Sequence, residues 1–215
     1  TRFKTEESKK LEYDLLTSIE HSKSLEIELY EEVKALVLSK LTEVTRLCEI
    51  LSILDVLCCF AYVSKINNYI KPKLNTDGDL VIRDSRHPIV EEVLKEEFVC
   101  NDVIMNMTSD RYLLITGPNM AGKSTYMRQV ALIVIMAHIG CYVPASYANI
   151  SITDKIFTRI GASDDISSGR STYMVEMEEV CNILKNSTSK SLVLLDEVGR
   201  GTSTSDGLAI AQAIT

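Results

Sequence analysis

The chain has 215 residues and a formal net charge of −7, and no stretch of it carries a dense block of lysine or arginine. Strong nucleic-acid binding needs a basic face that releases counterions, so this charge argues against a main DNA-gripping surface. The length allows one domain or two. Because the chain starts at Thr1 and its last residues resemble an unfinished helix, we expect a piece of a longer protein.

The first seventy residues contain neither glycine nor proline. Apolar residues recur there at steps of three to five, which keeps one face of a helix apolar. A single helix of that length would extend about 100 Å. We therefore expect a break near residues 22–24 or 39–42, giving a projecting helix that returns to a body. A compact helical bundle is the alternative. The periodic positions are Leu29, Val33, Leu36, Leu41, Val44, Leu47, Leu51, Leu54 and Leu57.

The composition shifts after Ile70, where Pro72 and a turn cluster at residues 75–79 appear. We place the domain boundary here, with a helical lever or core segment at 1–75 and a second domain at 76–215. Further strands and helices alternate along this second part. The expected strands are 80–83, 104–109, 112–115, 152–160 and 191–195, and the expected helical segments are 89–95, 126–139 and 173–185.

This alternation predicts an α/β domain with a mostly parallel sheet covered on both faces. Ligands of such domains bind at the carboxyl ends of the strands. The longest apolar run, residues 130–139, is about half a membrane span and predicts a core helix. The cysteines show no metal-ligand spacing, and four lie in apolar runs, which predicts buried cytosolic thiols. They are Cys48, Cys58, Cys59, Cys100, Cys141 and Cys181.

A glycine-rich loop of the pattern G-x-x-x-x-G-K-S lies between the expected strand 112–115 and the expected helix 126–139. Such a turn aims backbone N–H groups at a phosphate held at the positive end of the following helix. Lys123 would reach the outer phosphates, and the Ser124 hydroxyl would bind Mg²⁺. The pattern predicts nucleotide phosphate binding by Gly117, Pro118, Asn119, Met120, Ala121, Gly122, Lys123 and Ser124.

Two carboxylates follow the last expected strand. Asp196 would complete the Mg²⁺ site with Ser124. Glu197 would orient or deprotonate the attacking water. A small-residue loop at 168–172 opens a helix and predicts either a second anion site that faces another subunit's nucleotide or an ordinary capped helix start. The glycine-rich residues 199–207 fit a solvated turn or a dimer-contact loop.

Taken together, three motifs closely resemble the MutS family of DNA mismatch-repair ATPases. They are residues 117–125, the stretch DISSGRSTYMVEM at 165–177 and the stretch DEVGRGTSTSDG at 196–207. Residues 86–88 and 156–161 support the likeness, and the first seventy residues resemble the lever and core helices of the family.

The resemblance implies a truncated ABC-type P-loop ATPase domain preceded by long α-helices, with ATP or ADP and Mg²⁺ as cofactors. It also implies a homodimer or heterodimer that recognises mismatched DNA, mainly through domains outside this chain. The resemblance further implies a downstream repair factor of the MutL type as a partner and no membrane partner. The expected location is the cytoplasm of a bacterium or the nucleus of a eukaryote.

Individual roles follow from the same resemblance. Thr125 closes the phosphate-loop motif, and Asn119 would order the catalytic phosphate environment. Ser171 would reach the partner subunit's nucleotide. Phe98 and Val99 would flank the adenine, although by its sequence context alone Phe98 is more typical of a core residue.

Ala121 departs from the glycine that some members have at this position, a change that the loop should tolerate. The absent L-S-G-G-Q signature argues against an ABC transporter subunit or a structural-maintenance ATPase head. A recombination branch of the family and a nucleotide-binding module that does not hydrolyse stay open.

Overall fold

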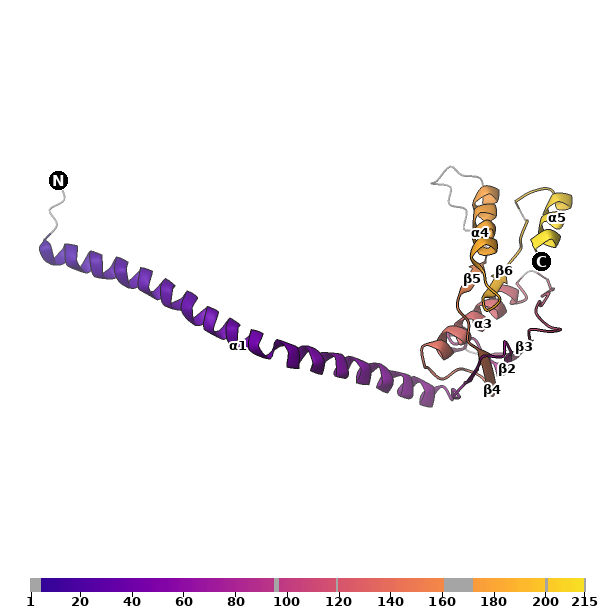
Figure 1. Cartoon of the computed structure of the whole chain (residues 1–215), viewed down its shortest axis with the longest axis horizontal. Helices are drawn as coiled ribbons and strands as arrows, with labels where there is room; N and C mark the ends of the chain where they lie inside the picture. Colours follow the sequence, from indigo (N-terminus) through magenta and orange to yellow (C-terminus); the bar gives the residue numbers. More distant parts are fainter. Residues whose placement is uncertain (1–4, 95–96, 119, 161–171, 200, 215) are drawn as a thin grey trace. The chain divides into compact units, whose positions relative to one another are not determined.

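The structure is a computed structural model, and it describes residues 5–94, 97–118, 120–160, 172–199 and 201–214. The chain divides into two units at residues 58 and 59. Its first element, α1 (Glu6–Ile66), is one continuous helix of 61 residues (Figure 1). The predicted helix is confirmed, and the predicted break is wrong. At one of the expected break points Ser39 bonds back to the Leu36 carbonyl (2.6 Å), so its hydroxyl is satisfied within the helix.

Most apolar side chains of α1 are exposed, and the buried residue of the helix is Ser64. By length and composition α1 is long and apolar enough to cross a membrane. It is also about three times longer than a bilayer requires, and its first half carries many charges. Length and composition therefore do not separate a membrane segment from a helix that packs on protein. The absence of a membrane partner stays a prediction.

The second unit contains two sheets. The four-stranded sheet has the order β1-β4-β2-β3, in which β1 runs parallel to β4 and β2 runs antiparallel to both β4 and β3. The second sheet is a parallel pair of β5 and β6. The strands are β1 (Lys73–Asn75), β2 (Leu80–Ser85), β3 (Asn101–Met105), β4 (Tyr147–Ser151), β5 (Ile156–Arg159) and β6 (Leu192–Leu195).

The predicted fold, an ABC-type domain with a mostly parallel sheet preceded by long helices, is wrong. One helix precedes the body, and the larger sheet is mixed because β2 is antiparallel to both of its neighbours. Residues 112–115, all described, form no strand, and Leu114 is 74% exposed. An extended segment becomes a strand only where a neighbouring strand takes its N–H and C=O groups.

The predicted strand 152–160 also differs from the structure. Its later part forms β5, and residues 152–155 are not in a strand, because the chain leaves the larger sheet at the end of β4 and enters the smaller one here. The other predicted elements are confirmed with shifted ends. The remaining helices are α2 (Val90–Val93), α3 (Lys123–His138), α4 (Thr172–Asn186) and α5 (Thr204–Ile214).

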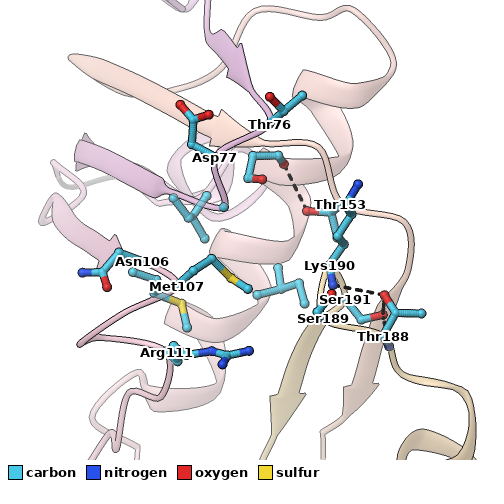
Figure 2. A pocket seen from close by; sticks show the side chains of 15 residues that line it. Thr76, Asp77, Asn106, Met107, Arg111, Thr153, Thr188, Ser189, Lys190 and Ser191 are labelled. Atoms are coloured by element: carbon cyan, nitrogen blue, oxygen red, sulfur yellow. Dashed lines mark hydrogen bonds between the residues drawn. The ribbon is translucent and has the colours of Figure 1, made fainter.

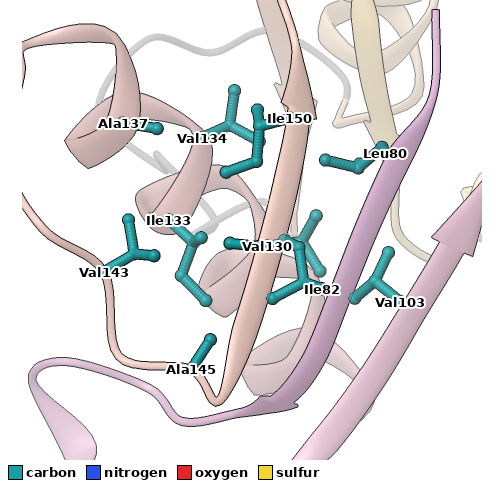
Figure 3. Packing of buried hydrophobic residues seen from close by; sticks show 11 residues of the cluster. Leu80, Ile82, Val103, Val130, Ile133, Val134, Ala137, Val143, Ala145 and Ile150 are labelled. Atoms are coloured by element: carbon teal, nitrogen blue, oxygen red, sulfur yellow. The ribbon is translucent and has the colours of Figure 1, made fainter. Parts of the chain in front are cut away.

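The core of the second unit forms around α3. One stripe of this helix, which includes Val130, Ile133 and Val134, packs on the larger sheet against residues such as Ile82 and Ile150 (Figure 3). A second stripe packs on β6 through Met127 and Ala131, which contact Leu194. A helix that is apolar on more than one side is buried on more than one side, which explains the long apolar run 130–139.

The cysteine prediction holds for one residue of six. Cys141 is buried, and burial raises the pKa of its thiol. Cys48, Cys58 and Cys59 are exposed on α1, and Cys100 and Cys181 are exposed in the second unit. Apolar neighbours in sequence do not bury a thiol when the whole segment is exposed. The domain boundary between residues 75 and 76 stays a prediction.

Candidate functional site

The glycine-rich loop leads directly into the first turn of α3. Gly122 precedes the helix with φ of 89°, a left-handed conformation that favours glycine. The Lys123 ammonium donates to the carbonyls of Gly117 (2.8 Å) and Pro118 (2.9 Å) and so closes the loop on itself. The helix then starts with the bond from the Tyr126 N–H to the Gly122 carbonyl (2.8 Å). The unpaired N–H groups of this first turn form a positive end next to the loop.

The end of β6 meets this first turn. The Ser124 hydroxyl donates a short hydrogen bond to the Asp196 carboxylate. Asp196 is held from the other side because its N–H donates to the Arg159 carbonyl (2.7 Å), which extends the ladder between β5 and β6. Leu194, two residues before Asp196 in the chain, packs on α3. Residues 72 positions apart in sequence thus place a hydroxyl and a carboxylate together.

Glu197 follows in a left-handed conformation, with φ of 49°. This conformation costs a residue with a side chain about 1–2 kcal/mol, so the surrounding structure must hold it. The N–H of Gly199 donates to the Glu176 carboxylate of α4 (2.6 Å), and Glu176 is 3% exposed. The turn after Asp196 is therefore fixed by a buried carboxylate from a different helix.

Phe98 and Val99 lie just before β3. Phe98 is half-buried, and Val99 is 81% exposed. The Asn101 amide donates to the Val99 carbonyl (3.0 Å), which fixes the backbone of this segment. The next residue, Asp102, is tied to α3 because the Tyr126 hydroxyl donates to its carbonyl (2.9 Å).

The Asp102 carboxylate is itself paired. It accepts the backbone N–H of Asp84 (2.9 Å) and the Arg83 guanidinium (2.7 Å). These two interactions lower the pKa of Asp102, the backbone bond having the larger effect. The start of β3 is thus attached to β2 as well as to α3.

The other predicted site residues lie in the phosphate loop, in α3 or outside the described residues. Thr125 lies in the first turn of α3, and Ala121 precedes it in the loop. Met120 has φ of 65° and a fully exposed side chain. Asn119 and Ser171, with the loop 168–171, lie outside the described residues.

Three polar residues near the site were not predicted from the sequence: Glu176, Ser85 and Gln129. Each is buried, with Ser85 and Gln129 fully enclosed. The available signal was a polar residue inside an apolar stretch, as for Gln129 in the helical run 126–139. Buried polar groups need partners, so such a position indicates a contact with another element.

A cavity of about 270 Å³ lies at the opposite end of β6 (Figure 2). Thr76, Arg111, Thr153 and Lys190 are among the residues that line it, together with Leu192 at the start of β6. No residue of the described phosphate loop, and neither Asp196 nor Glu197, borders it. The cavity is therefore separate from the predicted site.

Comparison with known proteins agrees with the motifs. The family model of MutS domain V matches residues 113–215, which include the loop, Asp196 and Glu197. The second half of the chain is thus of the MutS domain V class.

Similarity to curated proteins extends over nearly the whole chain. Proteins named DNA mismatch repair protein MutS from Clostridium botulinum strains Hall, Eklund 17B and Okra are 55%, 56% and 54% identical to it over 214 residues. These matches cover 99% of this chain and 23% of each relative. The chain belongs to the MutS family, and it spans about a quarter of the length of these relatives.

Proposed function

We propose that this chain is the nucleotide-binding part of a DNA mismatch-repair protein and that residues 117–125 bind ATP with Mg²⁺. The observation that carries the proposal is the contact between Ser124 and Asp196. It joins the first turn after a phosphate-loop motif to the carboxyl end of a neighbouring strand. Phosphate and metal ligands must meet at one place, and these two segments do.

The donor set suits Mg²⁺. A hydroxyl and a carboxylate are hard oxygen ligands, and Mg²⁺ commonly takes one or two protein ligands with water and phosphate oxygens for the rest. Ser124 and Asp196 would hold the ion. Mg²⁺ held by these two residues would supply positive charge that offsets the negative charge of the outer phosphates.

Lys123 would bind the outer phosphates. In the structure its ammonium is occupied by two loop carbonyls, which keep it beside the first turn of α3. Charge-assisted hydrogen bonds of this kind contribute about 1.5–3 kcal/mol, or roughly 10- to 150-fold in affinity. Asn119 and Thr125 complete the proposed phosphate environment, and Phe98 with Val99 would flank the base.

We propose that Glu197 would orient or deprotonate the water that attacks ATP during hydrolysis. It directly follows the metal-binding carboxylate, and its left-handed backbone is fixed by the neighbouring turn. General-base groups contribute about 10²–10⁴-fold to a rate. Glu197→Gln should therefore reduce turnover by that factor and leave nucleotide affinity nearly unchanged.

The wider role follows from the relatives, whose name is DNA mismatch repair protein MutS. By this relationship, two such chains would form a homodimer or heterodimer in which Ser171 reaches the partner's nucleotide. Mismatched DNA, bound mainly by other parts of the full protein, and a MutL-type repair factor are the proposed partners. A bacterial cytoplasm is the proposed location because these relatives are clostridial.

The test is nucleotide binding and turnover by the whole chain. A fluorescent ATP analogue with Mg²⁺ should bind the unaltered chain and should bind Lys123→Ala about 10- to 150-fold more weakly. Lys34→Ala removes the same charge from the exposed surface of α1 and serves as the control. No binding by the unaltered chain would overturn the proposal. Binding with equal, near-zero turnover by the unaltered chain and by Glu197→Gln would indicate a module that binds nucleotide without hydrolysis.

A further inference from the structure

A chain of hydrogen bonds runs from the phosphate-loop helix to the segment proposed to hold the base. The Gln129 amide donates to the Ser85 hydroxyl (2.6 Å), and this hydroxyl donates to the Asn101 carbonyl (2.5 Å). Gln129 and Ser85 have no solvent exposure. The Asn101 amide then donates to the carbonyl of Val99 (3.0 Å).

The fold makes this chain possible through an irregularity in β2. Leu80 and Ile82 point inward, and strict alternation would turn Asp84 inward next. The register of β2 against β3 shifts between Ile82 and Ser85, and Asp84 has φ of 47°. A bulge of this kind changes which side chain faces inward. Here it places Ser85 inside, against Gln129.

A second tie supports the first. Tyr126 lies three residues before Gln129 on α3, and its hydroxyl donates to the carbonyl of Asp102 (2.9 Å). Residues three apart lie on one face of a helix. The same face of α3 is therefore linked to two consecutive carbonyls, to that of Asp102 directly and to that of Asn101 through Ser85. The first turn of this helix carries the proposed phosphate ligands.

We infer that Gln129 and Ser85 are positioning residues that set the distance between the phosphate loop and the base-flanking segment of Phe98 and Val99. The inference rests on the proposed function. Neither residue needs to contact the nucleotide. Their contribution is to hold the base-flanking backbone on the helix whose first turn holds the phosphates, so that both ends of one nucleotide are engaged together.

The structure of Gln129 itself fits this role. Its Oε1 atom has no hydrogen-bond partner among the described residues, so the side chain leaves one buried acceptor unpaired to make the single bond to Ser85. Unpaired buried acceptors are destabilising. A leucine of similar size would avoid this cost, so Gln129→Leu should keep the fold while removing the bond.

The experiment compares two ligands on the full chain, MgATP and magnesium tripolyphosphate, which has no base. Gln129→Leu should bind ATP about five- to tenfold more weakly, because part of the free energy of base stacking would be lost. It should bind tripolyphosphate within about twofold of the unaltered chain, because this ligand has no base. Ser85→Ala should have the same effect, and the double variant should add little, because both changes break one chain of bonds. Ile133→Val, a change on α3 outside this chain of bonds, is the control for lost stability and should leave the ratio of the two affinities unaltered.

The outcomes separate the two proposals. If the unaltered chain binds neither ligand, the proposed function is wrong and the inference falls with it. If it binds both ligands equally well, the phosphate site stands and the base-positioning inference is overturned. The inference is also overturned if Gln129→Leu weakens both ligands equally or neither of them.

Discussion

Two regions of this chain are rich in apolar residues and use them in opposite ways. In residues 6–58 of α1, side chains such as Leu36 (67% exposed) and Val33 (61%) face solvent. In α3, Ile133 and Val134 are completely enclosed. The first region follows from local rules of helix formation, whereas the second depends on strands that are distant in sequence. Apolar periodicity therefore predicts a helix but does not show what the helix packs against.

The comparison is tested most strongly by truncating one side chain in each region. Ile133→Ala should lower the free energy of unfolding by about 2–5 kcal/mol because it leaves a cavity between α3 and the larger sheet. Leu51→Ala, at a position 52% exposed on α1, should change it by about 0.5 kcal/mol or less. Urea unfolding followed by circular dichroism measures both. Equal losses would mean that α1 is as firmly packed as α3.

A proline in α1 tests whether the two regions unfold separately. Leu47→Pro removes one helical hydrogen bond and clashes with the preceding turn, which costs about 3 kcal/mol or more locally. Amides of residues near 47 should then exchange with deuterium faster, while amides of β2 and α3 should exchange at an unaltered rate. Leu47→Ala is the control. Faster exchange in β2 would show that the body depends on an intact α1.

Within the body, two glycines sharpen the comparison between local conformation and distant contact. Gly140 and Gly199 share a φ of 84°, so alanine should cost each about 1–2 kcal/mol through the backbone alone. An added Cβ meets nothing at Gly140, but at Gly199 it would lie 2.7 Å from the Gly207 carbonyl oxygen. Gly199→Ala should therefore lower the thermal midpoint further than Gly140→Ala. Equal thermal midpoints would show that α5 moves away from the added Cβ without a loss of stability.

The smallest expected effect is a pH dependence from His87. Its Nδ1 accepts the N–H groups of Ile89 (3.3 Å) and Val90 (3.2 Å). Burial lowers its pKa; a backbone hydrogen bond opposes this in part, and Arg128 and then Glu91 have smaller lowering and raising effects. Below pH 6.5 the unfolded chain thus binds more protons than the folded chain, so stability falls as the pH falls. Each unit of lowered pKa contributes about 1.4 kcal/mol at most.

Thermal unfolding between about pH 5 and pH 7 measures this slope. His87→Gln should flatten it. His21→Gln, at an exposed position of α1, is the matched control and should leave the slope unaltered. A slope that survives the loss of His87 would assign the pH dependence to other groups.

The sequence predicted those parts of the body whose signals are local. The glycine-rich loop, α3 and β6 are all recognisable from a few consecutive residues. The sequence assigned Ser124 and Asp196 to one Mg²⁺ site, and the structure brings their side chains together, although the parallel sheet expected to align them is not formed. Glu176 was not predicted, since its partner is a backbone N–H at residue 199 that no sequence pattern identifies.

The strand pairing could not be predicted for a similar reason. β4 lies beside both β1 and β2, far from either in the chain, and the alternation of its five residues indicates a strand without identifying its neighbours. Residues 112–115 have the composition of a strand, but composition does not supply a neighbour. The sequence does not predict the exposure of five cysteines because apolar neighbours along the chain need not be neighbours in space.

The bulge in β2 has a consequence for reading related sequences. Ser85 faces Gln129 because one additional residue separates it from Ile82. A relative with the same spacing but a regular strand at this point would turn its serine toward solvent even if every amino acid around it were identical. A relative with one residue fewer between the isoleucine and the serine would turn its serine inward without a bulge, so a one-residue gap at this point of an alignment is compatible with the same contact.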